Sequence, residues 1–182
     1  RCMSKTTQKI LLTAENLFYE HGFNVGVDTI RDAANCSKTT MYNQFGSKDK
    51  LICEVLKSRD ARFRAELAHF MGENLTGWAA IEAIFQWHWS WFKQPDFNGC
   101  LFCRASAELD NRSEQIDNII NQHKSWILAL IQSNTQDHNK ALIIMTMLEG
   151  LISFNLIYHS DTKLCDEAMD SALGAIKHLF TD

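Results

Sequence analysis

Apolar residues recur every three or four positions along most of the chain, which is the spacing of one face of an α-helix. The first such stripe consists of Ile10, Leu11, Ala14, Leu17 and Phe18. It predicts a helix that begins near Thr6 and ends at Gly22, because glycine readily adopts the left-handed conformation that closes many helices. Two short helices are predicted next, at 27–35 and 38–45. Only Cys36 and Ser37 separate them, and the Ser37 hydroxyl can cap the second helix.

Six further helices complete the predicted fold. Ser47 can cap a long helix that reaches about Met71. Loops at 72–77 and around Pro95 and Gly99 then interrupt the pattern. The remaining helices are predicted at 77–93, 101–109, 113–133, 138–159 and 164–180. Since no segment alternates between apolar and polar residues as a half-buried strand does, we predict an all-α fold of about nine helices.

The composition is that of a globular helical protein. The chain has 182 residues, of which 46% are hydrophobic, and a single proline. Residues 141–158 are apolar enough to raise the question of a membrane span. Because Glu149, Gly150 and Asn155 interrupt this stretch, we expect a buried bundle helix and no membrane partner.

Charge is distributed unevenly between the two ends of the chain. The net charge of −4 for the whole chain argues against a nucleic-acid partner. Separate counts for the N-terminal and C-terminal parts change this conclusion. Residues 1–64 contain 11 Lys and Arg against 7 Asp and Glu, whereas residues 65–182 contain 7 against 15. We call residues 1–64 the head and residues 65–182 the body. A basic head and an acidic body suit a protein whose head contacts phosphates and whose body is repelled by DNA.

The first three helices predict a tri-helical helix-turn-helix unit, in which the last helix enters the major groove of DNA. An inserted helix needs short polar side chains for base edges and hydrogen-bond donors along its flank for phosphates. Residues 38–45, KTTMYNQF, supply both, and Met41 and Phe45 lie four positions apart as the inward face. A double-stranded DNA operator is therefore the expected partner.

Three segments carry a closer resemblance: GF at 22–23, GVDTI at 26–30 and SKTTMYNQFGSKDKL at 37–51. They resemble the TetR family of bacterial regulators, whose pattern ends in S-K-x-T-[LM]-Y-x-x-F-x-S-K-x-x-L, and the similarity spans about residues 7–55. The family turn usually reads Gly-Val where this chain has Asn35-Cys36. Because asparagine tolerates a left-handed conformation, we expect the turn to be preserved.

The resemblance implies a division of the chain and a role for individual residues. Residues 1–50 would form a homeodomain-like DNA-binding domain, and residues 51–182 a helical ligand-binding and dimerisation domain. The base-reading side chains would be Lys38, Thr39 and Asn43. Phosphates would be contacted by Gly26, Val27, Thr40, Tyr42 and Lys48. The implied protein is a homodimeric repressor of the bacterial cytoplasm that a small-molecule inducer releases from a near-palindromic operator.

An inducer pocket is expected in the C-terminal region, where the helix at 77–93 is rich in tryptophan. Cavities between bundle helices commonly hold ligands. The candidate pocket residues are Trp87, His88, Trp91, Phe102, Glu108, His123, Trp126 and Phe154. Aromatic rings near Glu108 or Glu149 would suit a flat cation, which is a hypothesis about the inducer.

The last two predicted helices carry more apolar residues than one protein body can bury, so we expect a self-complementary four-helix dimer interface. The predicted interface residues are Leu148, Leu151, Ile152, Leu173, Ile176 and Phe180. Ligand binding would shift the population of body geometries so that the two heads no longer match successive major grooves.

The remaining polar residues show no pattern of an active site. The seven His residues and the carboxylates form no recognisable nucleophile–base, paired-acid or metal arrangement, so we expect no enzyme, no metal and no cofactor. The six cysteines have no secreted-domain spacing, which favours a reducing compartment. Two alternatives stay open: a redox-responsive regulator that uses the CxxC pair Cys100 and Cys103, and a non-enzymatic helical adaptor.

Overall fold

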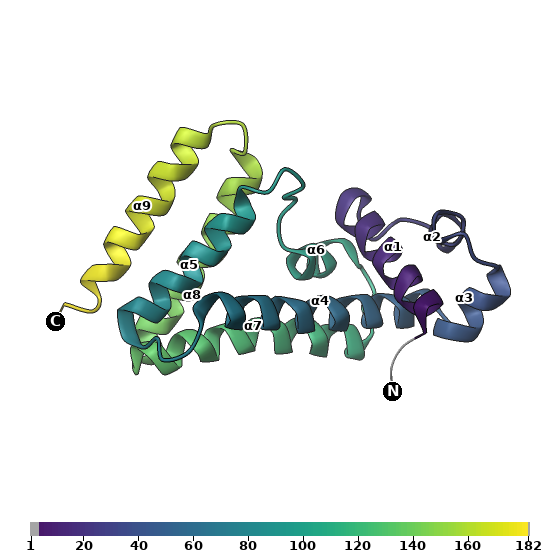
Figure 1. Ribbon diagram of the computed structural model, residues 1–182, viewed down its shortest axis with the longest axis horizontal. Coiled ribbons are helices and arrows are strands. Elements are labelled where there is room, and N and C mark those ends of the chain that lie inside the picture. The colour runs from purple at the N-terminus through teal and green to yellow at the C-terminus, as the bar shows by residue number, and fades with distance from the viewer. Residues whose placement is uncertain (1–3, 182) are drawn as a thin grey trace. The chain divides into compact units, whose positions relative to one another are not determined.

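A computed structural model describes residues 4–181, and these residues form nine α-helices and no strand (Figure 1). The all-α prediction is confirmed. The helices are α1 (Lys5–His21), α2 (Val27–Ala34), α3 (Lys38–Phe45), α4 (Lys48–Met71), α5 (Gly77–Phe92), α6 (Leu101–Glu108), α7 (Glu114–Thr135), α8 (His138–Ile157) and α9 (Thr162–His178). Their ends differ from the predicted ones by at most two residues.

The described residues form two compact units. The first contains the chain up to residue 62 together with residues 100–123, and the second contains residues 63–99 and 124–181. Helix α6 and the first part of α7 thus share a unit with α1, α2 and α3. The packing units do not follow the predicted division at residue 50, which stays a prediction about function.

The core of the first unit is built from the inward faces of α1, α2, α3 and the start of α4, together with residues of α6 and the first part of α7. The rings of Phe18 and Phe23 stack with their centroids 4.9 Å apart, and both side chains are buried. Met41 and Phe45 of α3 are also buried, as their four-residue spacing predicted. Since α3 uses only these two side chains to reach the core, the rest of this short helix is available to solvent.

In the second unit, α5, α8 and α9 lie side by side (Figure 1). Ile84, Ile144, Leu148 and Ile176 are fully buried in this unit. Helix α8 is long and apolar enough to cross a membrane by length and composition, a test that core helices of soluble proteins also pass. One third of its most apolar stretch is buried within the protomer, and the exposed part includes Ile143 and Ile157.

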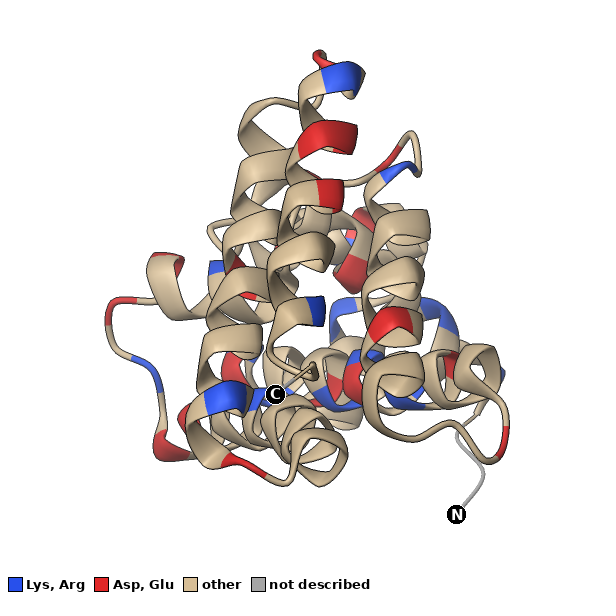
Figure 2. Ribbon diagram, turned by 90° about the vertical axis from the view of Figure 1, so that its left-hand side faces the viewer, with Lys and Arg blue, Asp and Glu red and all other residues tan. Residues whose placement is uncertain are grey.

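Acidic residues are prominent on the second unit. Figure 2 faces α9 and shows Asp and Glu positions along that helix. Asp166, Glu167 and Asp170 of α9 are all exposed. This distribution agrees with the charge count, in which the acidic excess lies after residue 64.

Candidate nucleic-acid interface

The turn between α2 and α3 has the geometry that its sequence predicts. Asn35 adopts the left-handed conformation, with φ 51° and ψ 54°, and its backbone N–H donates to the Asp32 carbonyl over 3.0 Å. Ser37 is the N-cap of α3, and its Oγ accepts a hydrogen bond of 3.0 Å from the Thr40 backbone N–H. Asparagine therefore replaces the usual glycine of this turn, because its short polar side chain tolerates a positive φ.

The residues predicted to read bases lie on the outer face of α3. Lys38, Thr39 and Asn43 are all exposed, whereas Met41 and Phe45 on the opposite face are buried. The Lys38 Nζ lies 6.0 Å from the centre of the Tyr42 ring. One face of α3 thus presents an ammonium group, a hydroxyl and an amide, which are groups that can reach base edges in a groove.

Three of the five predicted phosphate contacts, Tyr42, Gly26 and Val27, have polar groups without a partner among the described residues. Tyr42 is 46% exposed, and no described residue bonds to its hydroxyl. The first-turn N–H groups of α2, at Gly26 and Val27, likewise have no partner among residues 4–181. Thr40 is partly buried, and its hydroxyl lies 2.8 Å from the Ser37 Oγ. A helix N-terminus with open N–H groups favours a negative ligand.

Lys48, the fifth predicted phosphate contact, is engaged within the protein. Its Nζ donates a 2.5 Å hydrogen bond to the Phe23 carbonyl. Burial lowers the pKa of this ammonium, and the nearby Asp49 partly opposes that shift. Lys48 therefore ties the first turn of α4 to the segment between α1 and α2, a role that its position in the motif did not reveal.

The segment between α1 and α2 is also bonded to α6. The Phe23 backbone N–H donates to the Glu108 Oε2 over 2.8 Å. Arg104 donates to the other oxygen of Glu108 and, over 2.7 Å, to the Tyr19 carbonyl at the end of α1. We call Arg104 and Glu108 the α6 clasp. Because both backbone groups of Phe23 are bonded, to Glu108 and to Lys48, the loop that leads into α2 is fixed from two helices.

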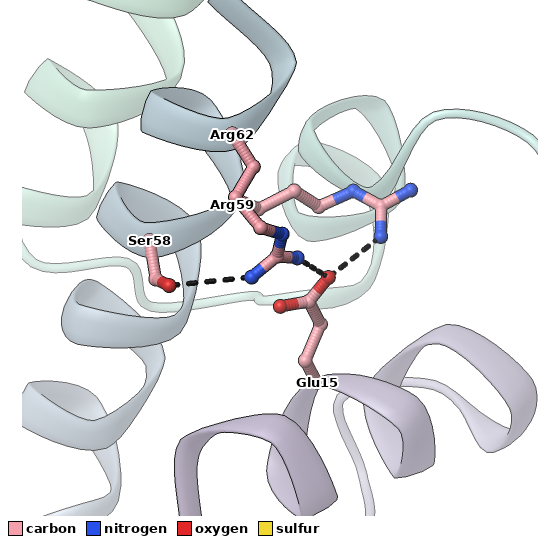
Figure 3. Close-up of polar contacts among 4 residues, drawn as sticks. All are labelled: Glu15, Ser58, Arg59 and Arg62. Carbon is pink, nitrogen blue, oxygen red and sulfur yellow. Dashed lines mark hydrogen bonds and ion pairs between the residues drawn. The ribbon is translucent and has the colours of Figure 1, made fainter. Parts of the chain in front are cut away.

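Helix α1 is joined to α4 by an ion cluster around Glu15 (Figure 3). Its carboxylate accepts from Arg59 over 2.8 Å and from Arg62, and the Glu15 side chain is only 6% exposed. Arg62 also donates to the Ser58 hydroxyl, and the Arg59 guanidinium lies 4.6 Å from the centre of the Tyr19 ring. A carboxylate buried to this degree is stable only when its charge is paired. The sequence signal for this cluster was a lone acidic residue on the apolar side of α1.

Three of the predicted pocket residues belong to the first unit and make contacts there. The rings of Phe102 and His123 stack with their centroids 3.7 Å apart, and both side chains are buried. The His123 Nδ1 lies 2.7 Å from the Asp60 Oδ1. Glu108 forms part of the α6 clasp described above. These contacts do not test ligand binding, which stays a prediction for the three residues.

The other five predicted pocket residues belong to the second unit. Trp87 and His88 each contact the ring of Phe63, with centroid distances of 4.8 Å and 5.8 Å. The His88 Nδ1 also lies 2.8 Å from the Ile84 carbonyl. The remaining contacts join Trp91 to Phe97, Trp126 to Phe63 and to the guanidinium of Arg64, and Phe154 to Tyr158. An aromatic cluster is present, and its binding function stays a prediction.

The predicted anions for a cationic ligand are already paired. Glu108 is bonded to Arg104, and the Lys124 Nζ donates to the Glu149 Oε1 over 2.7 Å. A cation would have to displace a guanidinium or an ammonium from these carboxylates. The pairing removes the basis on which a flat cation was favoured.

The predicted dimer-interface residues are largely covered within the protomer. Leu148, Leu151, Ile152 and Ile176 are buried there, and their contact with a partner stays a prediction. Leu173 is partly buried, and Phe180 packs edge-on against Trp78 with the ring centroids 5.9 Å apart. Periodicity identified these positions as apolar but could not tell which side of the helix faces the core.

No metal or disulfide chemistry is found in the described part of the chain. Residues 4–181 contain no group of three or more His, Cys, Asp and Glu that could hold a metal ion. None of their five cysteines forms a disulfide, and Cys2 lies outside the described residues. Cys100 is the N-cap residue of α6, and Cys103 is exposed on that helix. The redox hypothesis for this pair stays a prediction.

Comparison with known proteins agrees with this geometry. Residues 10–55 match the family model described as "Bacterial regulatory proteins, tetR family". The matched segment contains the whole helix-turn-helix, including Asn35, Ser37 and the outer face of α3. The helix-turn-helix segment belongs to the TetR family.

Solved structures show that the TetR fold extends over the rest of the chain. The TetR-family regulator SCO4454 from Streptomyces coelicolor is 21% identical with a TM-score of 0.89, over 97% of this chain and 96% of that one. A putative TetR-type regulator (sav143) from Streptomyces avermitilis is 26% identical with a TM-score of 0.80, over 96% and 99%. The reduced form of NemR from Escherichia coli is 21% identical with a TM-score of 0.79, over 96% of each chain. No curated protein sequence matches the chain.

Proposed function

We propose that this TetR-family protein is a ligand-responsive transcriptional repressor that binds a near-palindromic operator as a dimer. The observation that carries the proposal is the exposed polar face of α3, which is presented by a structured turn and a buried inner face. A dimer would place two such helices about 34 to 36 Å apart if they enter successive major grooves. As a non-enzymatic regulator of bacterial genes, it would act in the cytoplasm.

Base reading is assigned to Lys38, Thr39 and Asn43, because these exposed side chains share the outer face of α3. Footprinting on the DNA upstream of the protein's own gene tests the proposal directly. Protection of a near-palindromic site is expected, and Asn43→Ala should relax the preference at particular base pairs within it. Binding that ignores base sequence in the wild type would contradict the proposed operator.

Tyr42→Phe should weaken operator binding about 3-fold to 10-fold, because it removes one hydroxyl that can donate to a phosphate. The loss should be the same for every operator sequence, since phosphate contacts carry no base information. Binding is measured by fluorescence anisotropy with labelled duplexes. Tyr158→Phe is the matched control, because Tyr158 is 44% exposed but lies at the end of α8. If Tyr42→Phe and Tyr158→Phe bind the operator with equal affinity, the Tyr42 hydroxyl does not contact DNA.

Dimerisation is now assigned to an exposed stripe on α8 and α9. On α8 the stripe contains Ile143, Thr146, Gly150 and Ile157, and on α9 it contains Ser171 and Gly174. A Cβ added at Gly150 or Gly174 would meet nothing within 4 Å, so another helix can approach closely there. Ile143 and Ile157 are 47% and 66% exposed, and a partner would remove this apolar surface from water.

Ile143→Glu should convert the dimer to a monomer, because a carboxylate at the centre of an apolar interface would be buried without a partner. Light scattering after size-exclusion chromatography should give half the wild-type mass. Leu12→Glu is the control, since Leu12 is 57% exposed on α1, which belongs to the first unit. If Ile143→Glu keeps the wild-type mass, or the wild type is itself a monomer, the assignment is wrong.

Release from DNA is assigned to a small molecule that binds the predicted pocket residues of the second unit, which are Trp87, His88, Trp91, Trp126 and Phe154. Such a ligand acts by stabilising a geometry of the body that does not fit the operator. By thermodynamic linkage, the operator must weaken ligand binding by the factor by which the ligand weakens operator binding. Titrating an inducer with and without operator DNA measures both factors.

A further inference from the structure

A cavity of about 430 Å³ lies within the second unit, among α5, α8, α9 and the loop that follows α5. Its size is within the range of small-molecule sites. The lining includes Trp89, Phe92, Phe97 and Asn155, with Lys93 and Asp166 among its polar members. None of the eight predicted inducer-pocket residues lines it. We infer that this cavity is a binding site for a neutral, planar aromatic molecule that carries an N–H donor.

Aromatic rings form the apolar wall of the cavity. The rings of Phe92 and Phe97 have centroids 5.2 Å apart, and Trp89 meets Phe92 at 90° with a centroid distance of 6.3 Å. Phe92 is buried, although it borders the cavity. Faces and edges of rings set at such angles favour a flat aromatic guest, because stacked and edge-on contacts are both available to it.

Asn155 is the reason that the ligand is expected to carry an N–H donor. Asn155 is 4% exposed, and its side-chain N–H donates to the Leu151 carbonyl over 2.9 Å. The amide oxygen of Asn155 has no hydrogen-bond partner among the described residues. This oxygen is not sealed in the core, since the described residues contain no buried side-chain oxygen or nitrogen without a partner. It is therefore an accessible acceptor in the lining, and a ligand N–H in the cavity could donate to it in place of water.

The charged groups of the lining balance each other. The Lys93 Nζ lies 3.5 Å from the Asp166 Oδ1 and 4.2 Å from the centre of the Trp89 ring. Burial, together with Asp161 and Asp166, raises the pKa of the Cys165 thiol, which donates to the Tyr158 carbonyl and stays protonated. A charged ligand would therefore lose its hydration beside Phe92 and Phe97 without gaining an unpaired counter-ion, which favours a neutral one.

Three probes that share one ring system test the inference: naphthalene-2-carboxamide, naphthalene-2-carboxylate and 2-naphthylmethylammonium. Isothermal titration calorimetry on the full-length protein should give the carboxamide a Kd of roughly 50 µM, as expected for a small ligand of good efficiency. The anion and the cation should bind at least about 10-fold more weakly, because each would be desolvated without a partner. No detectable binding of the carboxamide, or equal binding of a charged analogue, would overturn the inference.

Asn155→Leu should weaken carboxamide binding about 10-fold, because it replaces the acceptor with an apolar group of similar size. Asn134→Leu is a closely matched control. Asn134 makes the same side-chain bond, to the carbonyl four residues earlier, but it does not line the cavity. Phe97→Ala removes an aromatic ring from the cavity lining and should also weaken carboxamide binding. It replaces Asn155→Leu as the test variant if Asn155→Leu does not fold. If Asn155→Leu, or Phe97→Ala where Asn155→Leu does not fold, binds the carboxamide with wild-type affinity, the carboxamide binds elsewhere and the inference is wrong.

Discussion

Glu15→Ala is expected to lower the free energy of unfolding by about 2.5 kcal/mol, between the effects typical of exposed and buried ion pairs. The Glu15 side chain is 6% exposed, while those of Arg59 and Arg62 are 21% and 46% exposed. Alanine would leave two guanidinium groups beside the core without their shared carboxylate. Part of this cost is relieved because Arg62 can turn toward water. Urea unfolding followed by circular dichroism at 222 nm measures the change.

A matched control for this prediction lies on the same helix. Glu20 is 67% exposed and lies 3.5 Å from His21, so Glu20→Ala should change stability by less than about 0.5 kcal/mol. Glu15→Gln should fall between the two alanine variants, since its amide oxygen can still accept from the guanidinium groups but carries no charge. If Glu15→Ala and Glu20→Ala are equally stable, the ion cluster does not anchor α1 to α4.

Gly22→Ala is expected to lower the free energy of unfolding by about 3 kcal/mol, through backbone strain and a steric conflict with the α6 clasp. Gly22 has φ 88° and ψ 171°, a conformation that residues with a Cβ rarely adopt. An added Cβ would lie 2.5 Å from the Glu108 Oε2 and 3.3 Å from an Arg104 nitrogen. The clasp would have to move, and the hydrogen bond from the Phe23 backbone N–H to Glu108 would be lost.

Two further variants separate the strain from the steric conflict, again by urea unfolding. Gly72 has φ 65° with nothing within 4 Å of an added Cβ, so Gly72→Ala should cost only the strain of a left-handed residue, about 1 kcal/mol. In the background of Glu108→Ala, Gly22→Ala should cost less than in the wild type, because the clashing carboxylate is absent. Identical costs in the two backgrounds would show that Glu108 does not approach Gly22 in solution.

Both predictions concern the contacts that position α3. Glu15 joins α1 to α4, and the α6 clasp joins the end of α1 to α6. Lys48 adds a bond between α4 and the same loop. Because α2 and α3 follow this loop directly, these contacts set where the exposed face of α3 is presented. Variants that loosen them should therefore weaken operator binding even though none of these side chains lies on that face.

Local sequence signals predicted the helix-turn-helix closely. Ser37 caps α3, Asn35 adopts a positive φ, and Gly22 ends α1, each as its residue type indicated. The exposure of Lys38, Thr39 and Asn43 also followed from helical periodicity. These features depend on neighbours within a few positions, so they can be read along the chain.

Long-range features were predicted less well. Leu148 and Ile176 of the predicted dimer interface are buried in the protomer, which periodicity could not show because apolar residues occur around most of α8. No local signal shows that Lys48 and Glu108 bond to the α1–α2 loop, while their contacts with phosphate and ligand stay predictions. The cavity lined by Asn155 brings together residues from α5, α8 and α9, and no motif connects them.

The amino-acid sequence by itself determined the nine helices, the capped turn and the polar face of α3, because capping, backbone conformation and helical periodicity are local properties. The tertiary structure alone decided which charges are paired, which apolar faces are already covered and where a cavity remains. Those outcomes depend on residues such as Glu15 and Arg59, 44 positions apart, whose meeting is set by the packing of whole helices.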